Sequence, residues 1–388
     1  MQDNITSDRK KLKILILSAP VGSGHRMAAN ALAEAFSKLP DVEVVQGNVF
    51  DFFPSVLGRF VLKSYAEILR IIPALYAFSY RWSNRSGGSV WIRDQLNAML
   101  LRVAKSFIDS VQPDLVFSTH ATPTGILSLY KEKYNPKLWL GVVVTDFTVH
   151  RWLLSQGADA YFLADKKLIP QVCGTAVAYP YGIPVRNAFS LLKKGVENRN
   201  EVRRRFGWNT DAFICLLLGG GGGMLPMESI LQKIKNTKLQ TGSNANPAAL
   251  HVIALTGDNK TLYRKISAMK AEYSGSGLAV LGFTDDLPKF LQGADLVISK
   301  AGGVSLAECL ACGKEVVIFD PLPGQEMENA SFVQREYGIR VAADTNELIE
   351  ILRHAIAETF AQRMKKQEQR RMAYGHPDAA AKIAALFR

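Results

Sequence analysis

The sequence predicts two α/β domains, each built on a parallel sheet, that face each other across a cleft. Three observations support this fold class. Short apolar runs alternate with helix-like segments, the same order appears twice, and each half opens with a strand that runs into a glycine-rich turn and a helix. The length of 388 residues also suits two domains better than one.

The first half begins with an expected strand over residues 13–19 and a helix over residues 27–39. Its other expected strands cover residues 42–46, 115–118, 138–144 and 160–163. The second half repeats the plan, with strands expected over residues 213–218, 251–255, 279–282, 296–299 and 315–319. Helix-like segments separate these strands, as parallel pairing requires.

Residues 179–186 separate the two halves, because two prolines and a glycine there disfavour both a helix and a central strand. We therefore predict a first domain over residues 1–178, a linker over 179–186 and a second domain over 187–388. The last segment, residues 377–388, predicts a short helix that can pack back on the first domain. Charged residues cluster at 200–205 and 362–371, where we expect solvated helix faces.

Composition narrows the class of protein. Apolar residues make up 48% of the chain and charged residues 21%, which is typical of a globular protein. Four scattered cysteines favour a reducing compartment, and no export signal is visible in the polar first residues, so a cytoplasmic location is expected. A net charge of +12 indicates an anionic partner: nucleic acid, a membrane surface or a phosphorylated small molecule.

The first glycine turn ends in Gly22, Gly24 and His25. A dinucleotide fingerprint would place glycine or alanine where this chain has Met27, and a P-loop motif is missing from the sequence. His25 can serve as a polar helix cap, or its imidazole can face a ligand and accept a proton. The residues alone leave both roles open.

Two further turns predict phosphate binding. Five consecutive glycines after a strand expose bare backbone to an anion; they are Gly219, Gly220, Gly221, Gly222 and Gly223. The other turn, Gly302-Gly303-Val304, opens a helix that carries Glu308, whose carboxylate can accept hydrogen bonds from a ribose diol. Gln325 and Glu326, after the next strand, can bind sugar hydroxyls.

A metal is not expected at this site. The sequence contains no Asp-x-Asp pair to hold a divalent ion against a diphosphate, so helix N-termini and backbone N–H groups would meet that charge. Cys309 and Cys312 have helical spacing and no second ligand pair, which favours buried packing over metal binding.

At these motifs the chain resembles the glycosyltransferase family of monogalactosyldiacylglycerol synthase and the processive diacylglycerol glucosyltransferases. It is more distantly similar to the peptidoglycan N-acetylglucosaminyltransferase that acts on lipid I. The resemblance covers most of the chain and rests on motifs at residues 22–25, 145–147, 181–186, 219–223, 282–286 and 300–329.

This resemblance implies two Rossmann-like domains of the GT-B type, with a UDP-sugar bound by the second and a lipid acceptor by the first. Phe283 would lie along the uracil and Glu308 would hold the ribose. The glycines with Val304 would cradle the diphosphate, and Gln325 and Glu326 would face the donor sugar. His25 would lie beside an acceptor site that includes Gly22 and Gly24, and Asp146 or His120 could assist. The general base would be His25 or, as the second candidate, Asp146.

The reaction implied is an inverting transfer of a hexose to diacylglycerol or a glycosyl-diacylglycerol, with neither a metal or other cofactor nor nucleic acid as a partner. Two alternatives stay open, a UDP-sugar epimerase and a non-catalytic nucleotide-sugar sensor. Release of UDP that depends on added lipid would separate the transferase from both.

Residues 56–82 predict an amphipathic helix that docks on the inner face of an anionic membrane. Apolar residues such as Phe60 recur three or four positions apart, while Arg59, Lys63 and Arg70 fall on the other face. These charges also disfavour a membrane-spanning helix. Residues 51–110 hold eight Lys or Arg and four Asp or Glu, a local excess of 8 − 4 = +4 that favours an anionic surface over burial against the sheet.

Overall fold

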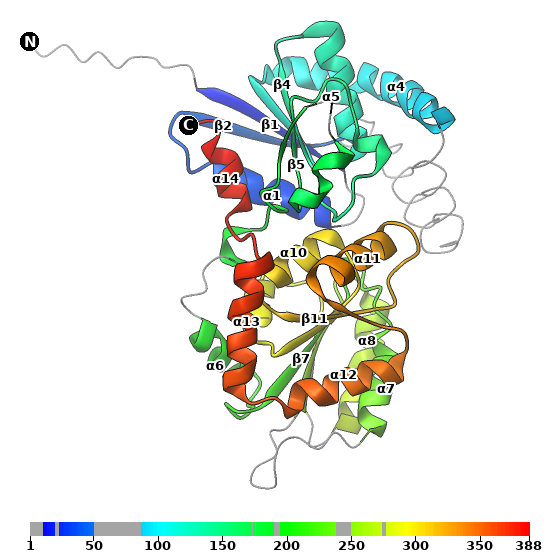
Figure 1. Ribbon diagram of the computed structural model, residues 1–388, viewed down its shortest axis with the longest axis vertical. Helices are drawn as coiled ribbons and strands as arrows, with labels where there is room; N and C mark the ends of the chain where they lie inside the picture. The colour runs from blue at the N-terminus through cyan, green and yellow to red at the C-terminus, as the bar shows by residue number, and fades with distance from the viewer. Residues whose placement is uncertain are drawn as a thin grey trace, which may run out of the picture.

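The chain forms two α/β domains stacked end to end in the computed structural model (Figure 1). The structure describes residues 11–19, 23–49, 87–172, 174, 176–189, 195–237, 250–273 and 277–388. Each domain holds a six-stranded sheet whose strand pairs are all parallel, the first in the order β2-β1-β3-β4-β5-β6 and the second in the order β12-β11-β10-β7-β8-β9. The predicted fold class is confirmed.

The first domain places helices on both faces of its sheet. Its strands are β1 Leu12–Ser18, β2 Val42–Asn48, β3 Leu115–Ser118, β4 Trp139–Val143, β5 Ala160–Phe162 and β6 Val177–Tyr179. Its helices include α1 Gly24–Phe36, α4 Gly87–Val111 and α5 Ala121–Tyr134, with 3-10 turns η2 Arg151–Leu153, η3 Lys166–Gln171 and η4 Asn187–Phe189. Apolar side chains of α1 pack on one face of the sheet, and those of α4 and α5 on the other.

The second domain repeats this arrangement. Its strands are β7 Phe213–Leu218, β8 Leu250–Leu255, β9 Leu278–Leu281, β10 Leu296–Ser299, β11 Glu315–Phe319 and β12 Arg340–Ala342. Its helices are α6 Gly195–Arg205, α7 Met227–Asn236, α8 Lys260–Ala268, η6 Met269–Tyr273, α9 Leu287–Gly293, α10 Gly303–Ala311, α11 Gln325–Tyr337, α12 Thr345–Ala357 and α13 Phe360–Tyr374. Helices α7, α8 and α12 cover one face, and α9, α10 and α11 cover the other.

The chain passes between the domains twice. It leaves β6 through residues 180–186, and it returns after α13 through residues 375–378 to α14 Ala379–Ala385, which lies against α1 (Figure 1). Phe387 then closes an aromatic cluster with Phe36, Phe117 and Trp139. The two connecting segments are in contact. Gly182 lies so close to His376 that a Cβ atom added to the glycine would be 2.3 Å from the His376 Cβ.

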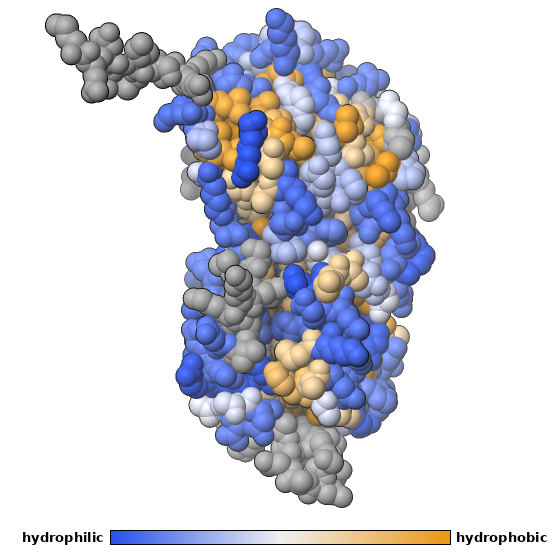
Figure 2. All heavy atoms as spheres, turned by 60° about the vertical axis from the view of Figure 1, so that its left-hand side comes forward, coloured by the Kyte–Doolittle hydropathy of each residue, from blue (hydrophilic) through white to orange (hydrophobic). Residues whose placement is uncertain are grey.

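From the side, the molecule shows two lobes with a waist between them, and its larger apolar patches lie on the first lobe (Figure 2). The apolar core nevertheless continues from one domain into the other, since a single cluster joins the α4 and α5 side of the first sheet to the α9, α10 and α11 side of the second. Among the described residues, no helix is both long and apolar enough to cross a bilayer.

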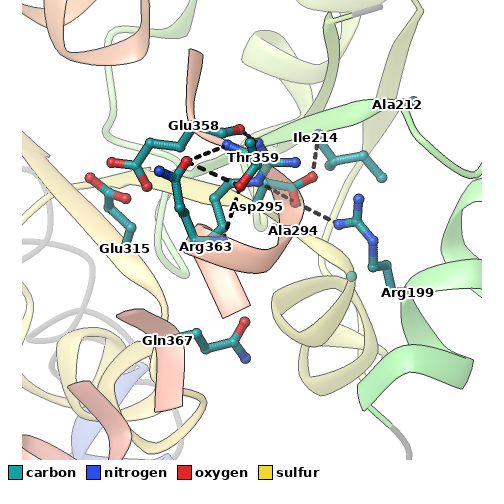
Figure 3. A network of polar contacts seen from close by, with 12 residues as sticks. Arg199, Ala212, Ile214, Ala294, Asp295, Glu315, Glu358, Thr359, Arg363 and Gln367 are labelled. Atoms are coloured by element: carbon teal, nitrogen blue, oxygen red, sulfur yellow. Dashed lines mark hydrogen bonds and ion pairs between the residues drawn. The ribbon is translucent and has the colours of Figure 1, made fainter. Parts of the chain in front are cut away.

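The expectation that both charged clusters are solvated is wrong for Arg203 in the first cluster and for Arg363 in the second. The side chains of Arg203 and Asp295 are fully buried, and those of Arg199 and Arg363 nearly so. Figure 3 shows the Arg199 and Arg363 side chains converging on Asp295. The Asp295 Oδ2 atom accepts from Arg203 Nη2 at 2.7 Å and from the backbone N–H of Ile214 at 2.9 Å.

These arginines are buried because one carboxylate and several backbone carbonyls replace their hydration. Burial lowers the pKa of Arg203 to about 10, although Asp295 opposes that shift. The cluster fixes α6 and α13 to the loop that precedes β10, and so holds the last long helix on the second domain.

Candidate active site

A pocket opens between the domains and is lined by residues of both. The second domain supplies most of its wall, and the first domain supplies the start of α1. Its lining residues are Ser23, Gly24, Met27, Arg186, Leu218, Gly220, Gly221, Leu255, Gly257, Gly282, Phe283, Thr284, Asp285, Leu287, Val304, Ser305 and Glu308.

Glu308 and Phe283 are brought together at this pocket, as their predicted roles require. Phe283 follows β9 and is 50% exposed, so part of its side chain is accessible for stacking. Glu308 lies on α10 and is 4% exposed. Burial raises the pKa of the Glu308 carboxyl to about 7, and the nearby Arg186 guanidinium opposes the shift.

The five-glycine turn after β7 divides into two parts. Gly220 and Gly221 line the pocket. Gly223 serves the turn itself, since its φ is +59° and a Cβ there would lie 2.1 Å from the Thr256 carbonyl oxygen. Gly219 is packed between Met227 and the Leu255 carbonyl, and Gly222 lies beside Met224. Bare backbone therefore faces the pocket at two of the five predicted positions.

The turn before α10 meets the first domain. Gly302 is the N-cap of α10, and Val304 lines the pocket. Gly303 is not among the lining residues, and a Cβ on it would lie 2.1 Å from the Thr145 carbonyl oxygen. A glycine at this position lets the two domains approach each other, and the α10 N-terminus still directs its dipole toward the pocket.

His25 lies in the first turn of α1, beside Gly24 and Met27, which line the pocket. Its Nδ1 is 2.6 Å from the Thr119 carbonyl oxygen and 2.9 Å from Thr145 Oγ1. Because a carbonyl only accepts, Nδ1 carries the proton and Nε2 keeps a free lone pair. Burial lowers the pKa of His25, while the charge of Asp146 opposes this, so the neutral imidazole is favoured near pH 7.

Asp146 is 7% exposed and both of its oxygens accept hydrogen bonds from the second domain. Asn329 Nδ2 donates to Oδ1 at 2.8 Å, and Gln325 Nε2 donates to Oδ2. Gln325 is thus engaged with Asp146, and Glu326 accepts the backbone N–H of Leu322 at 2.8 Å. Neither Gln325 nor Glu326 lines the pocket in this arrangement.

His120 lies next to His25, with the two ring centroids 4.8 Å apart. It is the N-cap of α5, and its Nδ1 accepts the backbone N–H of Thr122 at 3.2 Å. Burial lowers the pKa of His120 well below its usual value, and the neighbouring histidines add to this effect. Both histidines can therefore be neutral in the same site. The predicted Gly22, Arg59, Phe60, Lys63 and Arg70 lie outside the described residues.

Arg186 is a pocket residue that the sequence analysis did not single out. It ends the segment between the domains, and its guanidinium carbon lies 5.3 Å from the centroid of the Phe189 ring. Its Nε is buried and has no hydrogen-bond partner within the described part of the chain. Its guanidinium lies near the Glu308 carboxylate in the same pocket, and a cation in such a pocket can bind a phosphate. Its position at the end of the Pro-Val-Arg sequence between the domains is the feature by which the sequence could have indicated this residue.

Comparison with known proteins identifies the class. Residues 25–185 match the monogalactosyldiacylglycerol (MGDG) synthase family, and residues 214–384 match the glycosyltransferase family 28 C-terminal domain. Both halves of the chain thus match glycosyltransferase families, and the chain is a glycosyltransferase enzyme of GT-B architecture. The resemblance predicted from the motifs is confirmed.

One curated relative is the processive diacylglycerol β-glucosyltransferase of Bacillus subtilis, which is 25% identical over 91% of this chain and 90% of its own length. The crystal structure of Acinetobacter baumannii MurG superposes with a TM-score of 0.63 over 97% of this chain and 99% of its own, at 16% identity. The Neisseria meningitidis UDP-GlcNAc 2-epimerase also shares the fold, with a TM-score of 0.55 at 14% identity. The match covers 97% of this chain and 100% of the epimerase chain. Fold alone therefore does not separate a transferase from an epimerase.

Proposed function

We propose that this enzyme transfers a hexose from a UDP-sugar to the hydroxyl of a membrane lipid, diacylglycerol or a glycosyl-diacylglycerol, with inversion at the anomeric carbon. The observation that carries the proposal is the pocket between the domains. It combines a buried carboxylate, a half-exposed aromatic ring and bare glycine backbone in the second domain with the first turn of α1 in the first. The family matches and the similarity to a diacylglycerol glucosyltransferase support the same chemistry.

The donor would bind along the second domain. Phe283 offers a face for the uracil, and the ionised Glu308 can accept hydrogen bonds from the ribose diol. The diphosphate would then reach the backbone of Gly220 and Gly221 and the N-terminus of α10. Arg186, which lines the same pocket, would add positive charge. Together these groups can stabilise the leaving UDP without a metal ion.

His25 is the base that the geometry favours. Its Nδ1–H is held by the Thr119 carbonyl, which leaves Nε2 free to take the proton of the acceptor hydroxyl as that oxygen attacks the anomeric carbon. Asp146 is less suited to this role, because amides of the second domain occupy both of its oxygens. Its charge instead raises the pKa of His25 and stabilises the imidazolium that forms.

The acceptor would come from the membrane surface. The enzyme is proposed to lie on the cytoplasmic face of an anionic membrane, docked through the amphipathic sequence of residues 56–82 that carries Arg59, Lys63 and Arg70. Because these residues belong to the first domain in sequence, docking through them would bring that domain to the lipid surface.

The test is release of UDP from several UDP-sugars in the presence and absence of diacylglycerol vesicles, followed by mass spectrometry of the extracted lipid. A glycolipid whose formation matches the UDP released is the expected result. Turnover of the UDP-sugar without lipid would indicate an epimerase or hydrolase, and binding without turnover would indicate a sensor.

A further inference from the structure

Helix α11 lies along the boundary between the domains and presents one face to the first domain (Figure 1). Its contacts recur at helical spacing. They are Gln325 to Asp146, Asn329 to Asp146 and Phe147, Phe332 to the Phe147 ring, Glu336 to Lys167, and Tyr337 to Asp165. The helix that starts at the predicted donor-sugar residues therefore also contacts the first domain along its whole length.

Asn329 is the central and fully buried member of this face, with 0% exposure. Its Oδ1 accepts the backbone N–H of Phe147 at 2.8 Å. Its Nδ2 donates to Asp146 Oδ1 at 2.8 Å and to the Ala301 carbonyl at 3.0 Å. One side chain thus uses its carbonyl oxygen and both of its N–H donors on two loops.

Of the two loops joined by Asn329, one borders the proposed donor site and the other contacts the proposed base. Ala301 belongs to the turn that opens α10 at the diphosphate end of the pocket. Asp146 and Phe147 follow Thr145, whose Oγ1 is 2.9 Å from His25 Nδ1. The loops are also in direct contact, since a Cβ on Gly303 would lie 2.8 Å from Asp146 Oδ1. A continuous series of contacts therefore connects the donor turn to the base.

We propose that Asn329 is a positioning residue that holds the loop supporting His25 in register with the donor turn when the domains are closed. This inference rests on the proposed function. Reacting groups lose about 100-fold in rate when misplaced by about 1 Å, so a single amide at this junction can control turnover without touching either substrate. The uridine end of the pocket, at Phe283 and Glu308, lies outside this set of contacts.

Asn329 could instead contribute only to adhesion between the domains. Tyr337 provides the matched control, because its hydroxyl donates to Asp165 Oδ2 at 2.7 Å across the same interface and from the same helix. Tyr337→Phe removes an interdomain hydrogen bond at the far end of α11 from the pocket. If Asn329 contributes only adhesion, the two substitutions should lower kcat by similar factors. If it positions the loop, only the substitution of Asn329 should lower kcat.

The experiment compares wild type, Asn329→Ala and Tyr337→Phe by kcat and KM for lipid-dependent UDP release, by calorimetry with UDP, and by X-ray scattering with UDP bound. For Asn329→Ala we expect kcat to fall by about 10-fold or more, UDP affinity to stay within about threefold, and the radius of gyration to increase as the domains part. For Tyr337→Phe we expect kcat within about twofold of wild type.

An unchanged kcat in Asn329→Ala, or an equal loss in Tyr337→Phe, overturns the proposal. If Asn329→Ala fails to fold or to bind UDP, Asn329→Ser, which keeps a small donor, is judged by the same criteria. A wild type that shows no lipid-dependent UDP release refutes the proposed function rather than the positioning role. The scattering comparison still tests that role, and equal radii in all three proteins would reject it.

Discussion

Glu308→Gln should make the unliganded protein more stable at alkaline pH and should weaken its affinity for UDP. The carboxyl is 4% exposed, and burial raises its pKa from 4.5 to about 7. This change in pKa corresponds to about 3 kcal/mol. The folded-state pKa is the higher one, so the unfolded chain releases its proton first, and stability falls as pH rises from about 4.5 to 7.

Urea unfolding of wild type and Glu308→Gln at about pH 5 and about pH 8 measures this effect. Glutamine keeps the size of the side chain but cannot ionise. The variant should be more stable by about 3 kcal/mol at pH 8, and by less than about 1 kcal/mol at pH 5, where the folded carboxyl is still protonated. Calorimetry should show UDP affinity reduced by about 10- to 100-fold at pH 8, because charge-assisted hydrogen bonds to the ribose are lost.

The two effects together test one physical idea, that a buried carboxylate is retained for its ligand at a cost in stability. A variant that is less stable than wild type at pH 8 would show that Glu308 has structural partners that outweigh its desolvation. Unchanged UDP affinity in a folded variant would remove Glu308 from the donor site.

His25→Ala should lower kcat by about 10²–10⁴-fold with little change in UDP affinity. The kcat of the wild type should stay constant as pH falls to below about 6.5, because burial lowers the pKa of His25 and activity is lost only when this base is protonated. Turnover should persist in excess chelator, because backbone dipoles and a guanidinium can meet the diphosphate charge. Asp295→Asn should destabilise the fold by about 3–5 kcal/mol in urea unfolding, since buried guanidinium groups lose their carboxylate. Changing Arg59, Lys63 and Arg70 to Glu should release the protein from anionic vesicles and leave UDP binding intact.

Each of these four predictions would be contradicted by a specific result. An active His25→Ala with an inactive Asp146→Asn would transfer the base role to Asp146. Activity that is lost to chelator and restored by magnesium or manganese would reveal a metal site. Wild-type stability in Asp295→Asn would mean that the arginine side chains find water or other acceptors. Equal vesicle binding by the triple variant would place the docking surface elsewhere.

Much of the fold was predictable, because it depends on local patterns. The strands over residues 115–118, 213–218, 296–299 and 315–319 have the predicted bounds. Strands β6 and β12 were not predicted, and their three residues are too few to show a period of two, whereas the equally short β5 was predicted from the apolar run over residues 160–163. β6 also ends inside the segment predicted as the linker.

The buried arginines show why the rest could not be predicted. Arg203 lies in a run of charged residues that resembles a solvated helix face, and its partner Asp295 is 92 positions away. Only the packed fold makes this burial favourable, by supplying the carboxylate and the carbonyls together. The contact between Asp146 and Asn329 spans 183 positions and is equally invisible to local patterns.

The glycines of the site serve two purposes that the sequence does not separate. Gly220 has no atom within 4 Å of an added Cβ among the described residues, so its backbone is open to a ligand. Gly221 and Gly303 lie at the boundary between the domains, where a Cβ would be 2.6 Å from Ser23 Oγ and 2.1 Å from the Thr145 carbonyl oxygen. Gly24 is similar, at 3.3 Å from Val304 Cγ2. A glycine-rich turn in this architecture therefore reflects close approach of the domains as well as phosphate binding, and these two requirements converge where the base must meet the donor.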